Sequence, residues 1–139
     1  MDEKKNVSVN ITNVMLKEVK FVRAEQIGFE RYKINVADKV NVDNVANDGF
    51  KISYSREITN NDPFYAIVTF DVYLSLNEDG TNVFGGDLNK IKEFAEKRKN
   101  DIVINLSLPA RASLLIGNMT KEVGSVPLIM NPNLAIKNN

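Results

Sequence analysis

The chain contains no cysteine and no histidine. Without cysteine, the protein has no disulfide framework, no thiolate nucleophile and no cysteine-ligated metal. Histidine is the most common metal ligand and general base in proteins, so its absence removes the usual centre of acid–base and metal chemistry. The two absences argue against a metalloprotein and against most classes of enzyme, and no metal, cofactor or catalytic residue is expected.

The chain also lacks an excess of charge of one sign. Lys and Arg together number 18, and Asp and Glu together number 18, so the net charge is zero. Proteins that bind nucleic acid through its phosphates carry a basic surface, and this composition does not predict one. Nucleic acid is therefore not an expected partner.

Long apolar segments are missing as well. No run approaches the roughly 18 consecutive apolar residues of a membrane-spanning helix, so no membrane insertion is expected. The first ten residues, MDEKKNVSVN, are polar and charged and lack the apolar centre of a signal peptide. We expect a cytoplasmic protein in which residues 1–139 form a single domain, because this length supports one core.

The first half of the chain alternates apolar and polar residues, which is typical of β-strands. The longest such segment runs from Tyr65 to Leu76. A turn is expected at residues 47–49 (Asn-Asp-Gly), and a hairpin turn at Asp79-Gly80 would return the chain into Val83-Phe84. Shorter alternating segments contain Val7, Val9 and Ile11; Val19 and Phe21; Tyr32, Ile34 and Val36; Val40 and Val42; and Phe50, Ile52 and Tyr54.

The period of the apolar residues changes after residue 86. Asp87 is a suitable N-cap for a helix that carries Leu88, Ile91, Phe94 and Ala95 on one face. The short apolar run at residues 102–104 fits either a strand or a helix. Strands followed by helices predict an α+β fold, with an antiparallel sheet of about four strands and helices packed on one face.

The segment from Leu108 to Pro132 is the most informative part of the chain. Pro109 is favourable in the first turn of a helix, and Gly124 favours the left-handed conformation that ends one. Leu114 and Ile116 lie off the main apolar stripe, so the helix is apolar on more than one face and is expected to pack against another subunit or an apolar ligand. The stripe, which we predict as an oligomer interface, consists of Leu108, Ala112, Leu115, Met119 and Val123.

Several segments resemble, in order, the SecB family of protein-export chaperones. Leu16 to Phe21 (LKEVKF) is similar to that family's first strand, and Tyr65 to Gly86 (YAIVTFDVYLSLNEDGTNVFGG) is similar to its long hairpin strands. In the C-terminal part, the segments ARASLL, NMTKEVG, VPL and NP follow one another like the family's proline-led helix, terminal glycine and extended tail. The resemblance implies a SecB-like fold.

The same resemblance implies a holdase, a chaperone that binds unfolded or nascent polypeptides in apolar grooves without catalysis, and that forms a homo-oligomer, either a dimer or a tetramer. In the family, two elements together form these grooves: the crossover that joins two strands, and the long helix. The corresponding residues here are Phe21, Phe29, Tyr32, Ile116, Met119, Leu128 and Met130. The alternative for the aromatic residues is that they anchor a loop to the core, and Met119 and Met130 could equally fill the core.

Two features depart from the SecB pattern. The interval from Arg111 to Gly124 is longer than in the family, and the sequence ends soon after Pro132 without a second helix or an acidic tail. In the family the acidic tail contributes to docking on the export motor ATPase, SecA, so this partner is in doubt. A dedicated chaperone of a toxin–antitoxin system is one alternative, and a phage or surface assembly protein with a structural helix interface is another.

An enzyme or a small-ligand binder is the least favoured alternative. Four carboxylates could take part in acid–base chemistry: Asp38, Asp43, Glu57 and Asp62. No two of them have a sequence spacing that indicates a catalytic pair. All four stand beside turn or loop residues, so we expect them to be solvated.

Overall fold

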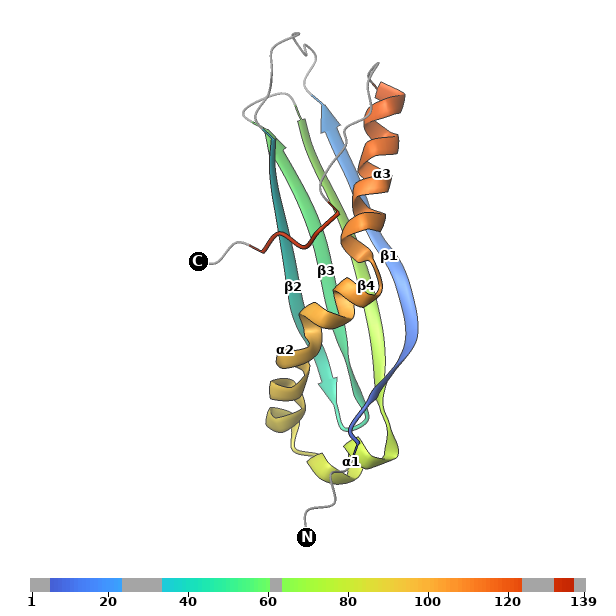
Figure 1. Cartoon of the computed structure of the whole chain (residues 1–139), viewed down its shortest axis with the longest axis vertical. Helices are drawn as coiled ribbons and strands as arrows, with labels where there is room; N and C mark the ends of the chain where they lie inside the picture. The colour runs from blue at the N-terminus through green and yellow to red at the C-terminus, as the bar shows by residue number, and fades with distance from the viewer. Residues whose placement is uncertain (1–5, 24–33, 61–63, 124–131, 137–139) are drawn as a thin grey trace.

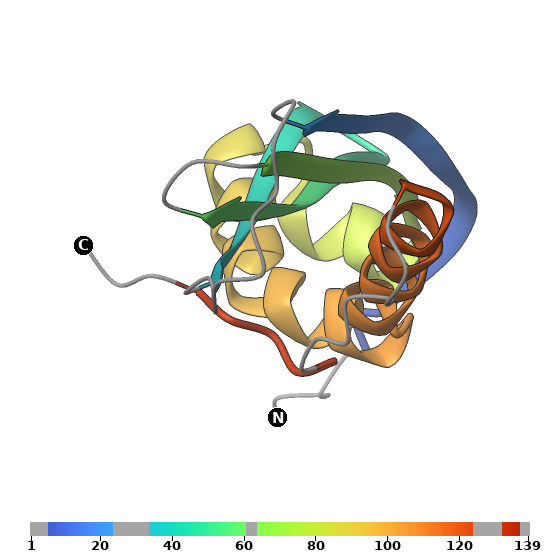
Figure 2. The same ribbon diagram turned by 90° about the horizontal axis from the view of Figure 1, so that it is seen from above.

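The computed structural model describes residues 6–23, 34–60, 64–123 and 132–136. Four strands form one antiparallel sheet in the order β1-β4-β3-β2, and the three helices follow the last strand (Figure 1). Figure 2 shows that the helices lie on one face of the sheet, which confirms the predicted α+β fold. The strands are β1 (Val9–Arg23), β2 (Ile34–Ala46), β3 (Gly49–Asn60) and β4 (Phe64–Leu76), and the helices are α1 (Glu78–Phe84), α2 (Leu88–Asn105) and α3 (Leu108–Val123).

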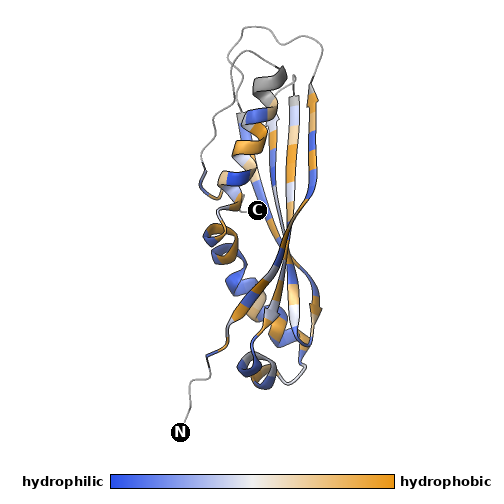
Figure 3. Cartoon of the chain, turned by 90° about the vertical axis from the view of Figure 1, so that its right-hand side faces the viewer, coloured by the Kyte–Doolittle hydropathy of each residue, from blue (hydrophilic) through white to orange (hydrophobic). Residues whose placement is uncertain are grey.

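The central strands β3 and β4 show why the alternating segments become strands. One face of each strand is buried beneath the helices, and polar and apolar residues alternate along the strands in Figure 3. The predicted turn after Ala46 is confirmed, and a Cβ at Gly49 would stand 2.1 Å from the carbonyl oxygen of Leu74, so only glycine fits there. The buried residues on this face are Phe50, Ile52, Tyr54, Arg56 and Ile58 of β3, and Ala66, Val68, Phe70, Val72, Leu74 and Leu76 of β4.

The predicted hairpin at Asp79-Gly80 is wrong, because these residues lie in helix α1. The side-chain oxygen of Asn77 accepts a hydrogen bond from the N–H of Gly80 at 2.8 Å and caps the helix. Gly85, at φ 54°, ends it in the left-handed conformation. Acidic residues and asparagine favour a turn and a helix N-terminus alike, so the local pattern does not separate the two structures.

Helix α2 begins where the sequence predicts. The side chain of Asp87 accepts hydrogen bonds from the N–H groups of Asn89 and Lys90, at 3.1 and 3.3 Å. The apolar run at residues 102–104 continues this helix. Among the described helices none alone is long and apolar enough to span a bilayer, and only α2 and residues Leu108–Met119 together, across a bend of 51°, meet that requirement.

Helix α3 is rotated relative to the predicted apolar stripe. Leu108, Ala112 and Ile116 are completely buried against the sheet, so Ile116 belongs to the core-facing side. Leu114, in contrast, is 67% exposed. Of the predicted stripe (Leu108, Ala112, Leu115, Met119 and Val123), only Leu108 and Ala112 are among the fully buried residues, and the side chain of Val123 lies outside the described residues. Residues at steps of three and four fit several neighbouring directions around a helix, so the spacing alone does not fix the buried face.

Candidate functional site

Apolar side chains are exposed along β1, on the same side of the sheet as the helices. Leu16 pairs with Phe70 and Val19 pairs with Val68, and paired residues of neighbouring strands share a face. Phe70 and Val68 are buried, whereas Leu16 is 48% exposed and Val19 is 40% exposed. The reason is that α2 packs mainly over β2 and α3 packs over β4 and β3, which leaves this face of β1 less covered.

Helix α3 presents two further apolar residues toward β1. Its Ser113 accepts a hydrogen bond from Arg56 of β3, so this side of the helix faces the other half of the sheet. Around the helix axis, Leu115 and Met119 are roughly 120–160° away from Ser113, so they lie on the side of α3 that faces β1. Both are half-buried against the core, and Figures 1 and 2 place α3 beside the second half of β1. We call this set the β1–α3 surface: Leu16, Val19, Phe21, Leu115 and Met119.

The structure places the predicted site residues in three groups. Phe21, Leu115 and Met119 lie in the β1–α3 surface and are half-buried. Three predicted residues have no exposed surface, since they fill the core: Leu108, Ala112 and Ile116. Ile116 was expected to contact clients, and the other two were expected to contact another subunit. The remaining predicted residues, Phe29, Tyr32, Leu128 and Met130, lie outside the described residues, as does the side chain of Val123.

A buried polar network lies on the other side of α3. Arg56 donates two hydrogen bonds to the carboxylate of Asp38, from Nε to Oδ1 and from Nη2 to Oδ2, each at 2.8 Å. The hydroxyl of Tyr54 donates a third to Oδ1 at 2.8 Å. Asp38 is 3% exposed and Arg56 is 0% exposed, so the expectation of a solvated Asp38 is wrong. A buried charge pair needs such bonds because desolvation is costly.

The network raises the pKa values of Tyr54 and Arg56. Burial raises the pKa of Tyr54 far above its usual range, and the negative charge of Asp38 raises it further. Tyr54 therefore stays a neutral hydrogen-bond donor. Burial alone would lower the pKa of Arg56, but its hydrogen bond and charge interaction with Asp38 leave that pKa raised. The guanidinium stays charged.

The same network joins segments that are far apart in sequence. Nη1 of Arg56 donates to the carbonyl oxygen of Pro109 at 3.4 Å and to the hydroxyl of Ser113, at the start of α3. Nη2 donates to the carbonyl oxygen of Asn133 at 2.7 Å. The N–H of Ala135 donates to Oδ2 of Asp38 at 2.7 Å, and the N–H of Asp38 donates to the carbonyl oxygen of Ala135 at 2.8 Å. The C-terminal segment is thus held against β2.

Sequence reasoning missed this network, although a signal for it exists. Asp38 stands in the alternating series Val36, Val40 and Val42, and Arg56 stands between Tyr54 and Ile58. Two opposite charges at inward positions of neighbouring strands predict a buried ion pair. Of the other candidate carboxylates, Asp43 is exposed, Glu57 is half-buried on the opposite face of the sheet, and Asp62 lies outside the described residues.

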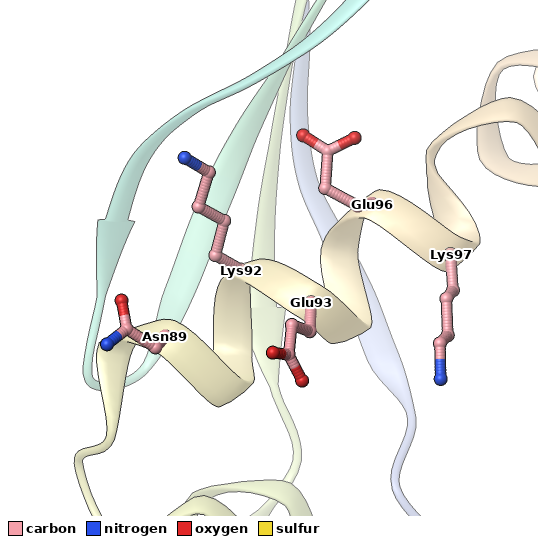
Figure 4. A pocket seen from close by; sticks show the side chains of 5 residues that line it. All are labelled: Asn89, Lys92, Glu93, Glu96 and Lys97. Carbon is pink, nitrogen blue, oxygen red and sulfur yellow. The ribbon is translucent and has the colours of Figure 1, made fainter.

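Two further hollows lie on the described surface. A cavity of about 460 Å³ lies between the start of α3 and the C-terminal segment, lined by Ile104, Ser107, Pro109, Ala110, Pro132, Asn133 and Leu134. A wider depression along α2, of about 600 Å³, is lined by Asn89, Lys92, Glu93, Glu96 and Lys97. Figure 4 shows that the side chains of this depression fan out from one helix and do not converge, so it offers no arrangement for acid–base chemistry.

Comparisons with known proteins identify a similar fold. No protein-family profile matches the chain, and no curated protein matches it in sequence. A solved structure of the SecB-like chaperone of Mycobacterium tuberculosis, in complex with a ChAD peptide from the HigA1 antitoxin, matches with a TM-score of 0.52 and 9% identity over 90% of this chain and 87% of that one. At this identity the match establishes the fold, and the fold of this chain is SecB-like.

Proposed function

We propose that the protein is a SecB-like holdase that binds unfolded segments of other proteins through the β1–α3 surface. The observation that carries the proposal is the exposed apolar face of β1 beside α3, with Leu16 and Val19 about half exposed. An isolated apolar residue on a surface needs no explanation, but a row of them along a strand beside a helix is typical of a binding surface.

The chemistry of this surface suits partners of varied sequence. Unfolded polypeptides expose apolar side chains, and burial of such side chains releases about 25 cal/mol for each Å² of apolar area removed from water. Met119 is flexible and polarisable, so it adapts to different side chains. Binding the unfolded state also keeps that state from aggregating, by mass action. Phe29, Tyr32, Leu128 and Met130 stay predicted members of the site.

A second candidate function has its own support. The solved SecB-like chaperone holds a peptide of an antitoxin, so a dedicated antitoxin client is the alternative to a broad set of clients. The two are distinguished by the choice of partner. A general holdase binds many unfolded proteins with similar affinity, whereas a dedicated chaperone prefers one segment by several kcal/mol.

We also propose that the protein is a homo-oligomer. Strand β1 is at one end of the sheet and pairs with β4 on one side only, among the described strands. Exposed edges that carry apolar residues favour pairing with another chain. Met15 and Val22, on the face of β1 opposite the helices, are each close to half exposed, and Leu114 is the most exposed apolar residue of α3 among those described. In the proposed interface, Met15, Val22 and Leu114 replace Leu108 and Ala112, while Leu115 and Met119 belong to the β1–α3 surface.

The experiment compares two double variants. Leu16→Ser with Val19→Ser removes the apolar side chains of the β1–α3 surface. Val83→Ser with Leu88→Ser removes two apolar side chains of similar exposure, 43% and 47%, on α1 and α2. The proposal expects the first variant to lose its suppression of the aggregation of an unfolded test protein, and the control to keep it, with both chains folded in a thermal melt. Equal suppression by the two variants would remove this surface from the function.

A further inference from the structure

We infer that the outer edge of β2 is a second polypeptide-binding site, and that residues 133–136 of the chain occupy it in the structure. The inference rests on the proposed function, since it assigns a further contact surface to the same kind of partner. It has an independent basis, namely the way in which Asp38 and Arg56 hold the C-terminal segment.

The C-terminal segment is held through its backbone. Arg56 donates to the carbonyl oxygen of Asn133, the carboxylate of Asp38 accepts from the N–H of Ala135, and the N–H of Asp38 donates to the carbonyl oxygen of Ala135. These three bonds engage main-chain groups that almost every residue possesses, proline being the exception for the N–H. A site that binds main-chain groups accepts chains of many sequences, as in the addition of a strand to the edge of a sheet.

The geometry is that of an added strand. Asp38 and Ile136 form a parallel β-bridge, so the C-terminal segment runs alongside β2 in the same direction. Asp38 and Arg56 form a pair in the β2–β3 ladder, and the N–H of Asp38 points away from β3. By the two-residue period of a strand, the main-chain groups of Val36 and Val40 point the same way and extend this edge in both directions.

The binding groups are held in place before any partner arrives. The carboxylate of Asp38 is fixed by Arg56 and Tyr54, and the guanidinium is fixed in turn by the hydroxyl of Ser113 and the carbonyl of Pro109. Charged groups that are already oriented lose little entropy on binding, and hydrogen bonds to charged groups are stronger than those between neutral ones.

One side chain adds a preference. Leu134 stands between the two main-chain contacts, packs against the core, and lines the 460 Å³ cavity with Ile104, Pro109 and Ala110. The site therefore fits an extended segment with an apolar residue between its two anchored peptide groups. Such segments are common in unfolded proteins and are buried in folded ones.

The tethered segment competes with any partner for this edge. A segment attached to the same chain acts at an effective concentration in the millimolar range, so a partner must displace it. Loss of one hydrogen bond between the segment and a charged group should raise the apparent affinity for the partner by about tenfold or more.

The test uses the full chain labelled with ¹⁵N and, as a partner, reduced and carboxymethylated α-lactalbumin, which stays unfolded. The amide signals of Asp38 and Ala135 report whether the edge is occupied by the C-terminal segment. The inference expects both signals to change with added partner, in proportion to the bound fraction measured independently by fluorescence anisotropy of the labelled partner.

Two variants at one position sharpen the test. Ala135→Pro removes the N–H that donates a hydrogen bond to Asp38, whereas the matched control Ala135→Ser keeps this N–H. The Pro variant should bind the unfolded partner about tenfold more tightly than the Ser variant, with both chains folded in a thermal melt. If Ala135→Pro does not fold, Leu134→Ser, which loosens the apolar contact of the same segment, should raise the affinity relative to wild type.

The outcomes separate the inference from the proposed function. Binding of the partner without a change at Asp38 and Ala135, and with equal affinity for the Pro and Ser variants, overturns the inference and leaves the proposed function standing. If no variant binds the partner, the proposed function fails, and a synthetic peptide with the sequence of residues 130–139 then tests the edge alone. That peptide should bind the Ala135→Pro chain, and the same peptide N-methylated at the alanine should not; equal behaviour of the two peptides overturns the inference.

Discussion

Replacement of Asp38 by Ala is expected to destabilise the protein strongly. The carboxylate accepts four hydrogen bonds, two from Arg56, one from Tyr54 and one from the N–H of Ala135. Its removal leaves a guanidinium with 0% side-chain exposure without its counter-charge. Removal of one partner of a buried ion pair costs about 3–5 kcal/mol, because the other charge stays desolvated. This is a large fraction of the roughly 5–15 kcal/mol that stabilises a typical domain.

The double variant Asp38→Leu with Arg56→Met separates charge from packing. It removes both charges and keeps comparable apolar volume, and replacement of a whole buried pair is often close to neutral. We expect its free energy of unfolding to exceed that of the Asp38→Ala variant by at least 2 kcal/mol, roughly the gap between these two effects. The measurement is urea unfolding followed by circular dichroism at pH 7. A double variant as unstable as Asp38→Ala would refute the argument, since the unpaired charge would then not be the cause.

Three further predictions concern the core, the hydroxyl of Tyr54 and the assembly. Ile116→Ala should lower the free energy of unfolding by about 2–5 kcal/mol, whereas Leu114→Ala should change it by less than about 0.5 kcal/mol. Urea unfolding measures both, and equal losses for the two variants would contradict the orientation of α3. The raised pKa of Tyr54 means that the folded state holds its proton more tightly than the unfolded state, so its contribution is complete below pH about 10 and is lost as the pH rises further. Tyr54→Phe should show a smaller loss of stability than wild type between about pH 9 and 11, and parallel curves would contradict this. Leu114→Asp should reduce the oligomer mass in light scattering without lowering the melting temperature, and a wild-type mass of 15.6 kDa at all concentrations would contradict the oligomer itself.

The sequence by itself determined the features that depend on neighbouring residues. Alternation with a period of two predicts the central strands, because one side of β3 and of β4 is buried. Asp87 caps α2 through contacts with residues two and three positions ahead, and Asn47-Asp48-Gly49 is a local turn pattern that the structure confirms between β2 and β3. The order of strands before helices was sufficient for the α+β class.

The tertiary structure alone decided the features that depend on distant residues. Asp38 meets Arg56 only because β2 pairs with β3 in one register, and it meets Ala135 across 97 positions of sequence. The direction in which α3 turns its apolar residues follows from the contact between Ser113 and Arg56, not from the spacing of those residues. Residue spacing restricts a helix face to a range of directions, and the partner across the interface selects one of them, since a buried charge is tolerated only where its hydrogen-bond partners stand.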